Sequence, residues 1–298
     1  MRLKIYSPLP RFPPLSLSGA ACELHCRHCN ATYLGGMLSA ETPEALWERC
    51  RVLQQNGAVG ALLSGGSDTG GALLNLAAMA DAIRQVKQET GLILNLHPGL
   101  IDAATAQKLA GAVDFASLDI PSDEVMQRVL GLDTTTADFI AAYHTLRAAG
   151  IDVVPHVTVY NGDEAGLLRP IAAAGAAPHT IVVIVFAPTR GTPLADAPAP
   201  GPEAVAHVVT EIKVLFPEAE SALGCMRPRT RPLREALERA ALQAGVVRME
   251  LPSPKTLRYA RDAGYEIVSF DACCALPVAY EPAAIRATRR SRSSTAPP

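Results

Sequence analysis

The stretch Cys22-Glu23-Leu24-His25-Cys26-Arg27-His28-Cys29 carries three cysteines in the spacing CxxxCxxC. It follows a short apolar run at residues 15–18, which predicts a loop at the end of a β-strand. Thiolates are soft ligands that suit iron–sulfur clusters, and three of them on one tight loop can hold three corners of a cubane. Because the loop has no fourth cysteine, one iron of such a cluster would stay open to a small ligand.

A zinc site is the alternative interpretation of the same loop. Structural zinc motifs usually combine two CxxC-like pairs, and this loop has only one CxxC. His25 and His28 are too close in sequence to the cysteines to complete a zinc ligand set comfortably. The spacing therefore favours an iron–sulfur cluster.

The composition narrows the class of protein. The chain has 298 residues, with 27 Lys and Arg against 29 Asp and Glu, for a formal net charge of −2. This balance argues against a protein that mainly binds nucleic acid or anionic membranes, since both require a basic excess. Hydrophobic residues make up 49% and charged residues 19%, which is typical of a folded chain rather than a disordered one.

The cellular context follows from the apolar runs and the cysteines. No run approaches the roughly 18 apolar residues of a membrane helix. Prolines at positions 8, 10, 13 and 14 interrupt the start of the chain, so we expect no signal peptide. Seven cysteines without a secretory signal argue against a disulfide framework. We expect a cytoplasmic protein, with Cys50 as an isolated core residue.

Short apolar runs alternate with helical patterns along the chain. Strands are predicted at residues 15–18, 61–64, 92–97, 114–119, 153–159 and 181–186, then 218–223, 246–251 and 266–270. Helices are predicted at residues 41–56, 72–89, 102–111, 134–149, 163–174, 231–244 and 254–263. This alternation predicts an α/β fold with a parallel sheet and outer helices. We divide it into an extended entry (1–14), a six-unit barrel core (15–195), a C-terminal βα extension that completes or covers the core (196–280) and a basic flexible tail (281–298).

Each predicted strand of the core ends in polar or special residues. In a parallel barrel these ends face one common mouth, where active sites are built. The first strand leads into the cysteine loop and the second into a glycine-rich turn. The others end at or contain polar residues, so we expect one site at one face. The residues at these ends are Ser64, Gly65, Gly66, Ser67, His97, Asp119, His156 and Arg190.

In these features the chain resembles the radical S-adenosylmethionine (SAM) superfamily, whose signature is the CxxxCxxC spacing. The resemblance implies a radical SAM (βα) barrel in which Cys22, Cys26 and Cys29 ligate a [4Fe-4S] cluster. It implies that the open iron chelates SAM, and that His28 stacks near the adenine. The turn Ser64-Gly65-Gly66-Ser67 would bind the methionyl amine, with Asp68 as the nearest acidic residue. His97, Asp119 and His156 would contact ribose, adenine or substrate.

Further segments resemble the biotin synthase and lipoyl synthase-like branch, most closely the archaeal-type lipoyl synthase that acts as a pair of proteins. The turn Phe186-Ala187-Pro188-Thr189-Arg190-Gly191-Thr192-Pro193-Leu194 resembles that of biotin synthase-like enzymes. The narrower resemblance is carried by Cys29-Asn30 through Tyr33-Leu34-Gly35-Gly36-Met37, Leu62-Leu63-Ser64-Gly65-Gly66-Ser67, Val154-Pro155-His156, Gly224-Cys225-Met226-Arg227-Pro228-Arg229 and Cys273-Cys274-Ala275-Leu276-Pro277. A sulfur-inserting enzyme needs a sulfur donor, and Cys225, Cys273 and Cys274 fit three ligands of a second, auxiliary [4Fe-4S] cluster. In the better-known lipoyl synthases a serine near the C-terminus is the fourth ligand, and Ser291-Arg292-Ser293-Ser294 is the corresponding match here. A pair of buried apolar residues is the alternative for Cys273 and Cys274.

The resemblance implies a sulfurtransferase that acts on an unactivated C–H bond of a protein-bound octanoyl chain, in lipoyl cofactor biosynthesis. A second homologous radical SAM protein would make the other thiolation. The expected partners are an octanoylated carrier protein or lipoyl domain and a ferredoxin or flavodoxin reductant, with no nucleic acid and no membrane. Two alternatives stay open: a radical SAM methylase, mutase or peptide-modifying enzyme, and a non-catalytic iron–sulfur redox protein.

Overall fold

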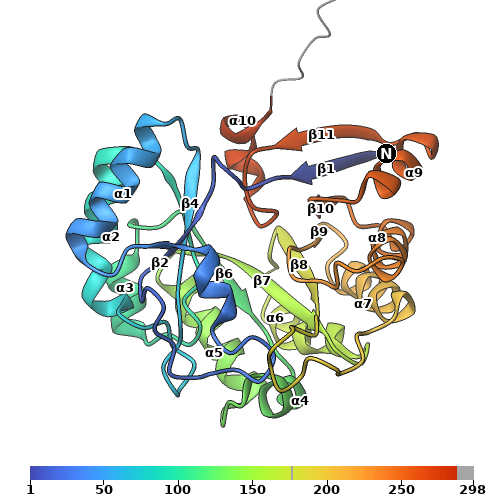
Figure 1. Ribbon diagram of the computed structural model, residues 1–298, viewed down its shortest axis with the longest axis horizontal. Helices are drawn as coiled ribbons and strands as arrows, with labels where there is room; N and C mark the ends of the chain where they lie inside the picture. Colours follow the sequence, from blue (N-terminus) through green and yellow to red (C-terminus); the bar gives the residue numbers. More distant parts are fainter. Residues whose placement is uncertain (176, 287–298) are drawn as a thin grey trace, which may run out of the picture.

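The computed structural model describes residues 1–175 and 177–286, and within them eleven parallel strands form one curled sheet (Figure 1). The strand order is β11-β1-β10-β9-β8-β7-β6-β5-β4-β2-β3. No pairing joins β3 to β11 among the described residues, so the sheet is an open half-barrel. The strands are β1 (Arg2–Tyr6), β2 (Pro14–Ser16), β3 (Leu38–Ser39), β4 (Gly60–Ser64), β5 (Ile93–Leu96), β6 (Phe115–Asp119), β7 (Asp152–Val159), β8 (Thr180–Val185), β9 (Glu220–Leu223), β10 (Arg248–Glu250) and β11 (Glu266–Phe270).

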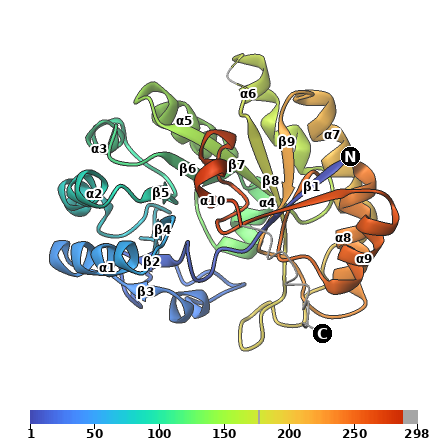
Figure 2. The ribbon, with the colours of Figure 1, turned by 90° about the horizontal axis from the view of Figure 1, so that it is seen from above.

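Helices form an outer ring that is open between α1 and α9 (Figure 2). Capping side chains fix several helix starts: Thr42 accepts a hydrogen bond from the Ala45 N–H, and Asp102 accepts one from the Thr105 N–H. The ring consists of α1 (Pro43–Gln55), α2 (Leu76–Thr90), α3 (Ala103–Leu109), α5 (Thr136–Ala148), α6 (Arg169–Ala173), α7 (Pro202–Leu215), α8 (Leu233–Ala244) and α9 (Pro254–Asp262). Shorter helical segments are α4 (Asp123–Val125), α10 (Glu281–Ala284), η1 (Thr32–Gly36), η2 (Met126–Leu130), η3 (Glu164–Leu168) and η4 (Val278–Tyr280).

Two apolar cores hold the fold together. The larger one lies between the sheet and the helices, and Cys50 is fully buried in it, as predicted. The smaller one lies inside the half-barrel. There, inward residues of the strands, such as Ile93, Phe115 and Val182, pack against Cys274 and Leu276 of the segment after β11. This C-terminal segment therefore fills part of the barrel interior, and α10 lies within the ring of helices (Figure 2).

The predicted parallel α/β barrel is confirmed, and the sheet also contains strands that the sequence did not reveal. The N-terminal residues are not merely an extended entry, because β1 pairs with both β10 and β11. The stretch 196–217 holds the unpredicted helix α7, which packs against α8. No helix among the described residues is both long and apolar enough to span a membrane.

The predicted flexible tail at 281–298 needs correction for its first six residues. Glu281 is buried, and its carboxylate accepts hydrogen bonds from Tyr6 Oη at 2.7 Å and Lys4 Nζ at 2.9 Å. Ile285 forms an antiparallel bridge with Phe270. These contacts hold residues 281–286 against the sheet. The expected match at Ser291-Arg292-Ser293-Ser294 and the remaining basic residues lie outside the described residues.

Candidate functional site

A cavity of about 630 Å³ lies inside the half-barrel and is lined by half of the predicted site residues, but not by Cys22, Cys26, Cys29 or the turn at residues 64–67. Apolar side chains such as Phe12, Leu62 and Val182 form much of its wall. Its chemically active lining consists of His28, His97, Asp119, His156, Cys225, Cys273 and Cys274. One cavity therefore brings together residues from the cysteine loop, the strand ends and the C-terminal segment.

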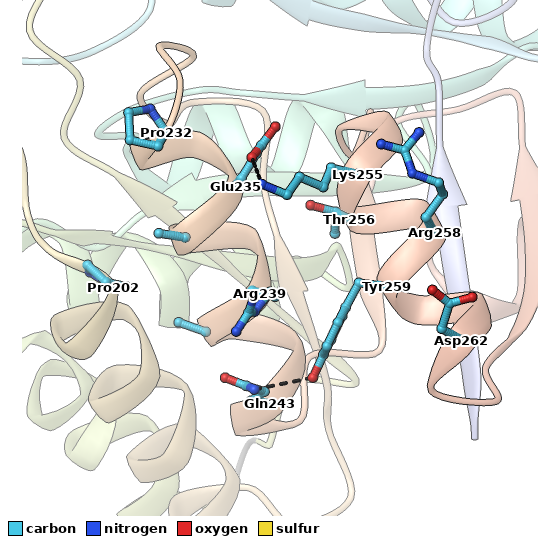
Figure 3. A pocket seen from close by; sticks show the side chains of 12 residues that line it. Pro202, Pro232, Glu235, Arg239, Gln243, Lys255, Thr256, Arg258, Tyr259 and Asp262 are labelled. Atoms are coloured by element: carbon cyan, nitrogen blue, oxygen red, sulfur yellow. Dashed lines mark hydrogen bonds and ion pairs between the residues drawn. The ribbon is translucent and has the colours of Figure 1, made fainter.

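A second groove lies outside the barrel, between α8 and α9 (Figure 3). Its lining residues include no cysteine or histidine, and several of its polar groups pair with one another. Lys255 Nζ lies 2.9 Å from a carboxylate oxygen of Glu235, and the Gln243 amide donates to Tyr259 Oη at 3.2 Å. The Arg239 guanidinium stacks 5.2 Å from the centre of the Tyr259 ring. The barrel cavity is therefore the stronger candidate site.

The cysteine loop bends tightly around its thiols. The Cys29 N–H donates to the Cys26 carbonyl at 3.2 Å, and left-handed backbone at His25 and Asn30 turns the chain on either side. A hydrogen bond between the two thiols raises the pKa of Cys26 and lowers the pKa of Cys29 to about 7. Ligand atoms of Cys26, His28 and Cys29 all lie within 4.8 Å of one another. The loop is thus arranged to hold a metal centre.

The donor set fits a [4Fe-4S] cluster with three thiolate ligands. Cys22 begins the loop, and its Sγ lies 3.8 Å from the Ser67 carbonyl, outside the set Cys26, His28 and Cys29 whose ligand atoms lie within 4.8 Å of one another. His28 Nδ1 is buried without a hydrogen-bond partner, which leaves one polar atom for a bound group. The tight set Cys26, His28 and Cys29 also suits a single zinc ion, contrary to the expectation that His28 lies too close in sequence to serve. Metal and sulfide analysis separates the two.

Two aromatic rings lie near His28, both tilted with respect to it, and its stacking on adenine stays a prediction. Its ring centre is 6.0 Å from that of Tyr33 and 6.5 Å from that of Phe186. Burial lowers the pKa of His28, and the charge of Asp119 opposes this effect. The turn after β8 contacts one of these two rings, because Thr189 Oγ1 lies 2.8 Å from Tyr33 Oη. Arg190 on this turn is exposed and does not line the cavity.

The glycine-rich turn lies directly against the cysteine loop. The Ser67 carbonyl accepts hydrogen bonds from the Glu23 N–H at 2.8 Å and the Leu24 N–H at 3.2 Å, while the Gly66 N–H donates to Ser18 Oγ at 2.7 Å. The Asp68 carboxylate accepts from the N–H groups of Gly70 and Ala72, so it holds its own turn. Contact of Ser64, Gly65, Gly66 and Ser67 with SAM stays a prediction, and the turn's visible role is to position the loop.

Gly66→Ala should displace the cysteine loop. A Cβ at this position would collide with the Ala21 carbonyl and lie 2.6 Å from Cys22 Cβ, and neither neighbour is the end of a flexible side chain. We expect the variant to lose the iron bound by this loop, which is about four irons for one cubane. Gly35→Ala is the matched control, because no atom lies within 4 Å of its added Cβ. Equal iron in the two variants would contradict the close packing.

His97, Asp119 and His156 form a polar cluster on the cavity wall. His97 Nε2 lies 3.3 Å from Asp119 Oδ2, and the two histidine rings are 6.1 Å apart. Burial lowers the pKa of His156 to about 4, against the attraction of Asp119, and its Nδ1 donates to the Val154 carbonyl at 3.0 Å. Burial alone would lower the pKa of His97. The charge of Asp119 and its hydrogen bond to His97 outweigh burial, so the pKa of His97 is raised. His156 is thus neutral at neutral pH, whereas Asp119 favours the charged form of His97.

The His97–Asp119 pair predicts a pH dependence. The raised pKa of His97 stabilises the fold below its ordinary value of 6.5, and this contribution is lost as pH rises through the folded pKa. The pKa of Asp119 is lowered, because its attraction to His97 and the other histidines outweighs burial, so its contribution is lost only at acid pH. We expect Asp119→Asn to lower the pKa of His97, measured by NMR titration of the histidine ring protons. An unchanged His97 titration would show that the pair does not control its charge.

The three C-terminal thiols come from two separate loops. Cys225 follows β9, and Cys273 and Cys274 follow β11. Burial raises the pKa of Cys273 to about 11, and it raises the pKa of Cys274 well above its ordinary value. These thiols are therefore protonated at neutral pH, and metal binding must release their protons. The Asn95 amide donates to Cys273 Sγ at 3.5 Å.

Several residues that line the barrel cavity were not predicted from the sequence. Asn95 interrupts the apolar strand β5, and it exchanges hydrogen bonds with Ser117 at 3.0 and 3.1 Å. A polar residue inside a buried strand is the signal that could have revealed it. Arg227, Arg229 and Glu250 also line the cavity. Two of these lie in the quoted Gly224-Cys225-Met226-Arg227-Pro228-Arg229 segment, but nothing in the sequence predicted their pairing with Glu250.

Comparisons with known proteins agree with this fold. No family model matches the chain. A biotin synthase from Synechococcus sp. (strain JA-3-3Ab) is 24% identical over 75% of this chain and 74% of its own length. One from Methylococcus capsulatus (strain ATCC 33009 / NCIMB 11132 / Bath) is 25% identical over 72% and 68%. In solved structures, methylornithine synthase (PylB) superposes with a TM-score of 0.57 at 18% identity, covering 85% of this chain and 73% of PylB. The [FeFe]-hydrogenase maturase HydG from Carboxydothermus hydrogenoformans gives 0.60 at 15% identity, with 89% and 67% coverage.

The parallel half-barrel is thus the fold of these solved structures. Its relatives in sequence include biotin synthases, and its CxxxCxxC loop is the feature that resembles the radical SAM superfamily. That resemblance implies a [4Fe-4S] cluster and SAM. These comparisons do not specifically support the auxiliary cluster or the lipoyl reaction.

Proposed function

We propose that the chain is a radical SAM sulfurtransferase that replaces a hydrogen of a protein-bound octanoyl chain with sulfur. The observation that carries the proposal is the shared cavity, which is lined by His28 of the cysteine loop and by the thiols of Cys225, Cys273 and Cys274. A substrate carbon in this cavity would lie between the two groups of thiols. Such an arrangement suits a reaction that removes hydrogen on one side and adds sulfur on the other.

With the groups bound, SAM and the first cluster would supply a 5′-deoxyadenosyl radical that removes a hydrogen atom, and the second cluster would supply the sulfide that takes its place. The residues of this chain position the substrate. Apolar side chains such as Leu62, Val129 and Ile184 line the cavity and suit an alkyl chain. They exclude water from the reacting carbon.

The partners follow from this chemistry as part of the proposal. The octanoyl chain would be carried by a carrier protein or lipoyl domain, since the substrate is protein-bound. Each SAM cleavage needs one low-potential electron, for which a ferredoxin or flavodoxin is suited. A second homologous radical SAM protein would add the other sulfur.

The test is a reaction of anaerobically reconstituted protein with SAM, dithionite and an octanoyl-lysyl peptide. We expect 5′-deoxyadenosine and a peptide that gains one sulfur atom, measured by mass spectrometry. 5′-Deoxyadenosine without sulfur transfer to this or a longer lipoyl-domain substrate would favour a methylase, mutase or peptide-modifying enzyme. No 5′-deoxyadenosine from a fully loaded protein would favour a non-catalytic iron–sulfur protein.

A further inference from the structure

Strand β10 places two charged side chains on the inner face of the half-barrel. Side chains alternate along a strand, so Arg248 and Glu250 share one face, while Met249 packs in the core on the helix side. The Arg248 side chain is fully buried and that of Glu250 is 5% exposed. Buried charges are costly unless they are paired and hydrogen-bonded. Their partners therefore indicate what they do.

Arg248 holds the loop that carries Cys273 and Cys274. Its Nη1 donates to the Leu276 carbonyl at 2.6 Å and to the Cys274 carbonyl at 3.2 Å. The rest of the guanidinium is fixed by two carboxylates: Nη2 donates to Glu281 at 2.9 Å and Nε donates to Glu220 at 2.5 Å. Because the carboxylates fix this planar guanidinium, its remaining N–H groups point in fixed directions and hold the two carbonyls in place.

Glu250 holds the loop that carries Cys225, through two arginines. Its Oε2 accepts from Arg229 Nη2 at 2.8 Å and lies 3.4 Å from Arg227 Nη1. Arg229 Nη2 in turn donates to the Cys225 carbonyl at 2.7 Å, and Arg227 Nη1 donates to the Gly224 carbonyl at 2.5 Å. The backbone on both sides of the Gly224–Cys225 peptide is thus tied to Glu250.

We propose that Arg248 and Glu250 are positioning residues that fix the two thiol-bearing loops relative to each other. The inference rests on the proposed function, because it assigns these residues to the second cluster. Cys225 and the Cys273–Cys274 pair are far apart in the sequence, and β10 is one rigid element that holds both. A core built only for stability would use apolar side chains here, since replacing buried ion pairs by apolar residues is often neutral or stabilising. The guanidinium donors instead reach the carbonyls beside the thiols.

Arg248→Lys and Glu250→Gln test the proposal, with Met249→Leu as the control on the opposite face of the same strand. Lysine keeps the charge but lacks the planar fork, and glutamine keeps the shape but weakens the hold on Arg227 and Arg229. The measurements are iron and sulfide per chain after anaerobic reconstitution, the electron paramagnetic resonance spectrum after reduction, and the melting temperature. We expect about eight irons in the wild type and Met249→Leu, falling toward about four in the two test variants, with one cluster signal lost and the fold retained.

The outcomes separate this proposal from the function on which it rests. Eight irons and unchanged spectra in both variants would overturn the positioning role. Loss of all iron together with the fold in both variants would also overturn it, because the network would then serve general stability. About four irons in the wild type itself would instead refute the second cluster, and with it the proposed function.

Discussion

Cys26→Ser is expected to abolish SAM cleavage. Cys26 is buried on the tight loop, its thiol is hydrogen-bonded to that of Cys29, and its ligand atom lies within 4.8 Å of those of His28 and Cys29. Removal of this thiolate leaves too few soft ligands for the first cluster, so reconstituted iron should fall from about eight to about four per chain. The 5′-deoxyadenosine formed with SAM and dithionite should fall by at least about 1,000-fold, as when a central catalytic group is removed.

The control for this prediction is Cys50→Ala. Cys50 is a buried thiol on α1, in the core between the sheet and the helices, and it does not line the cavity. Iron content and 5′-deoxyadenosine formation should stay close to wild type. A wild-type protein that holds zinc without sulfide, and loses it in Cys26→Ser, would contradict the cluster and assign the loop to a single metal ion.

The Cys225/Cys273/Cys274→Ala triple variant is expected to separate hydrogen removal from sulfur insertion. These thiols line the part of the cavity contributed by the loops after β9 and β11, away from the cysteine loop in sequence. Iron should fall from about eight to about four, which corresponds to one cubane. 5′-Deoxyadenosine should still form, while sulfur transfer to the octanoyl-lysyl peptide should fall below detection.

Two results would contradict this second prediction. Eight irons in the triple variant would show that the C-terminal thiols hold no cluster. Undiminished sulfur transfer with only four irons would show that the sulfur comes from another donor. The Cys50→Ala variant again controls for the loss of a buried thiol, because it lies outside the cavity.

The sequence was sufficient for the parts of the protein that depend on local pattern. The apolar runs at β5, β7 and β8 stand out because both faces of a parallel sheet are buried. The cysteine loop stands out because its ligands are neighbours in the chain. By contrast, β1 is a five-residue strand followed by prolines, and only its pairing with β10 and β11 makes it part of the sheet. Glu281 seemed to begin a solvated tail because its partners, Lys4 and Tyr6, lie at the other end of the sequence.

The residues of the candidate site also divide into those that a local sequence pattern predicts and those that depend on contacts between distant parts of the chain. Strand-end residues such as His97 and Asp119 were predictable, because parallel strands end at a common edge. The contacts of Arg248 with Cys274 and Leu276 were not, since they join residues from different loops. The residues around an arginine in a short strand do not indicate whether its side chain is buried and paired or exposed to solvent.

The position of β1 has a consequence for how the chain matures. This strand precedes every other strand of the sheet in the chain, yet both of its neighbours in the sheet, β10 and β11, come after all the others. Pairing across such a sequence separation is slow, because a long loop must close before any contact forms. The pocket of the C-terminal thiols, which depends on Lys4, Tyr6 and Glu281 around Arg248, is thus finished last. The CxxxCxxC loop, framed by β2 and β4, can be in place while the ribosome is still extending the chain, before the pocket of the C-terminal thiols is closed.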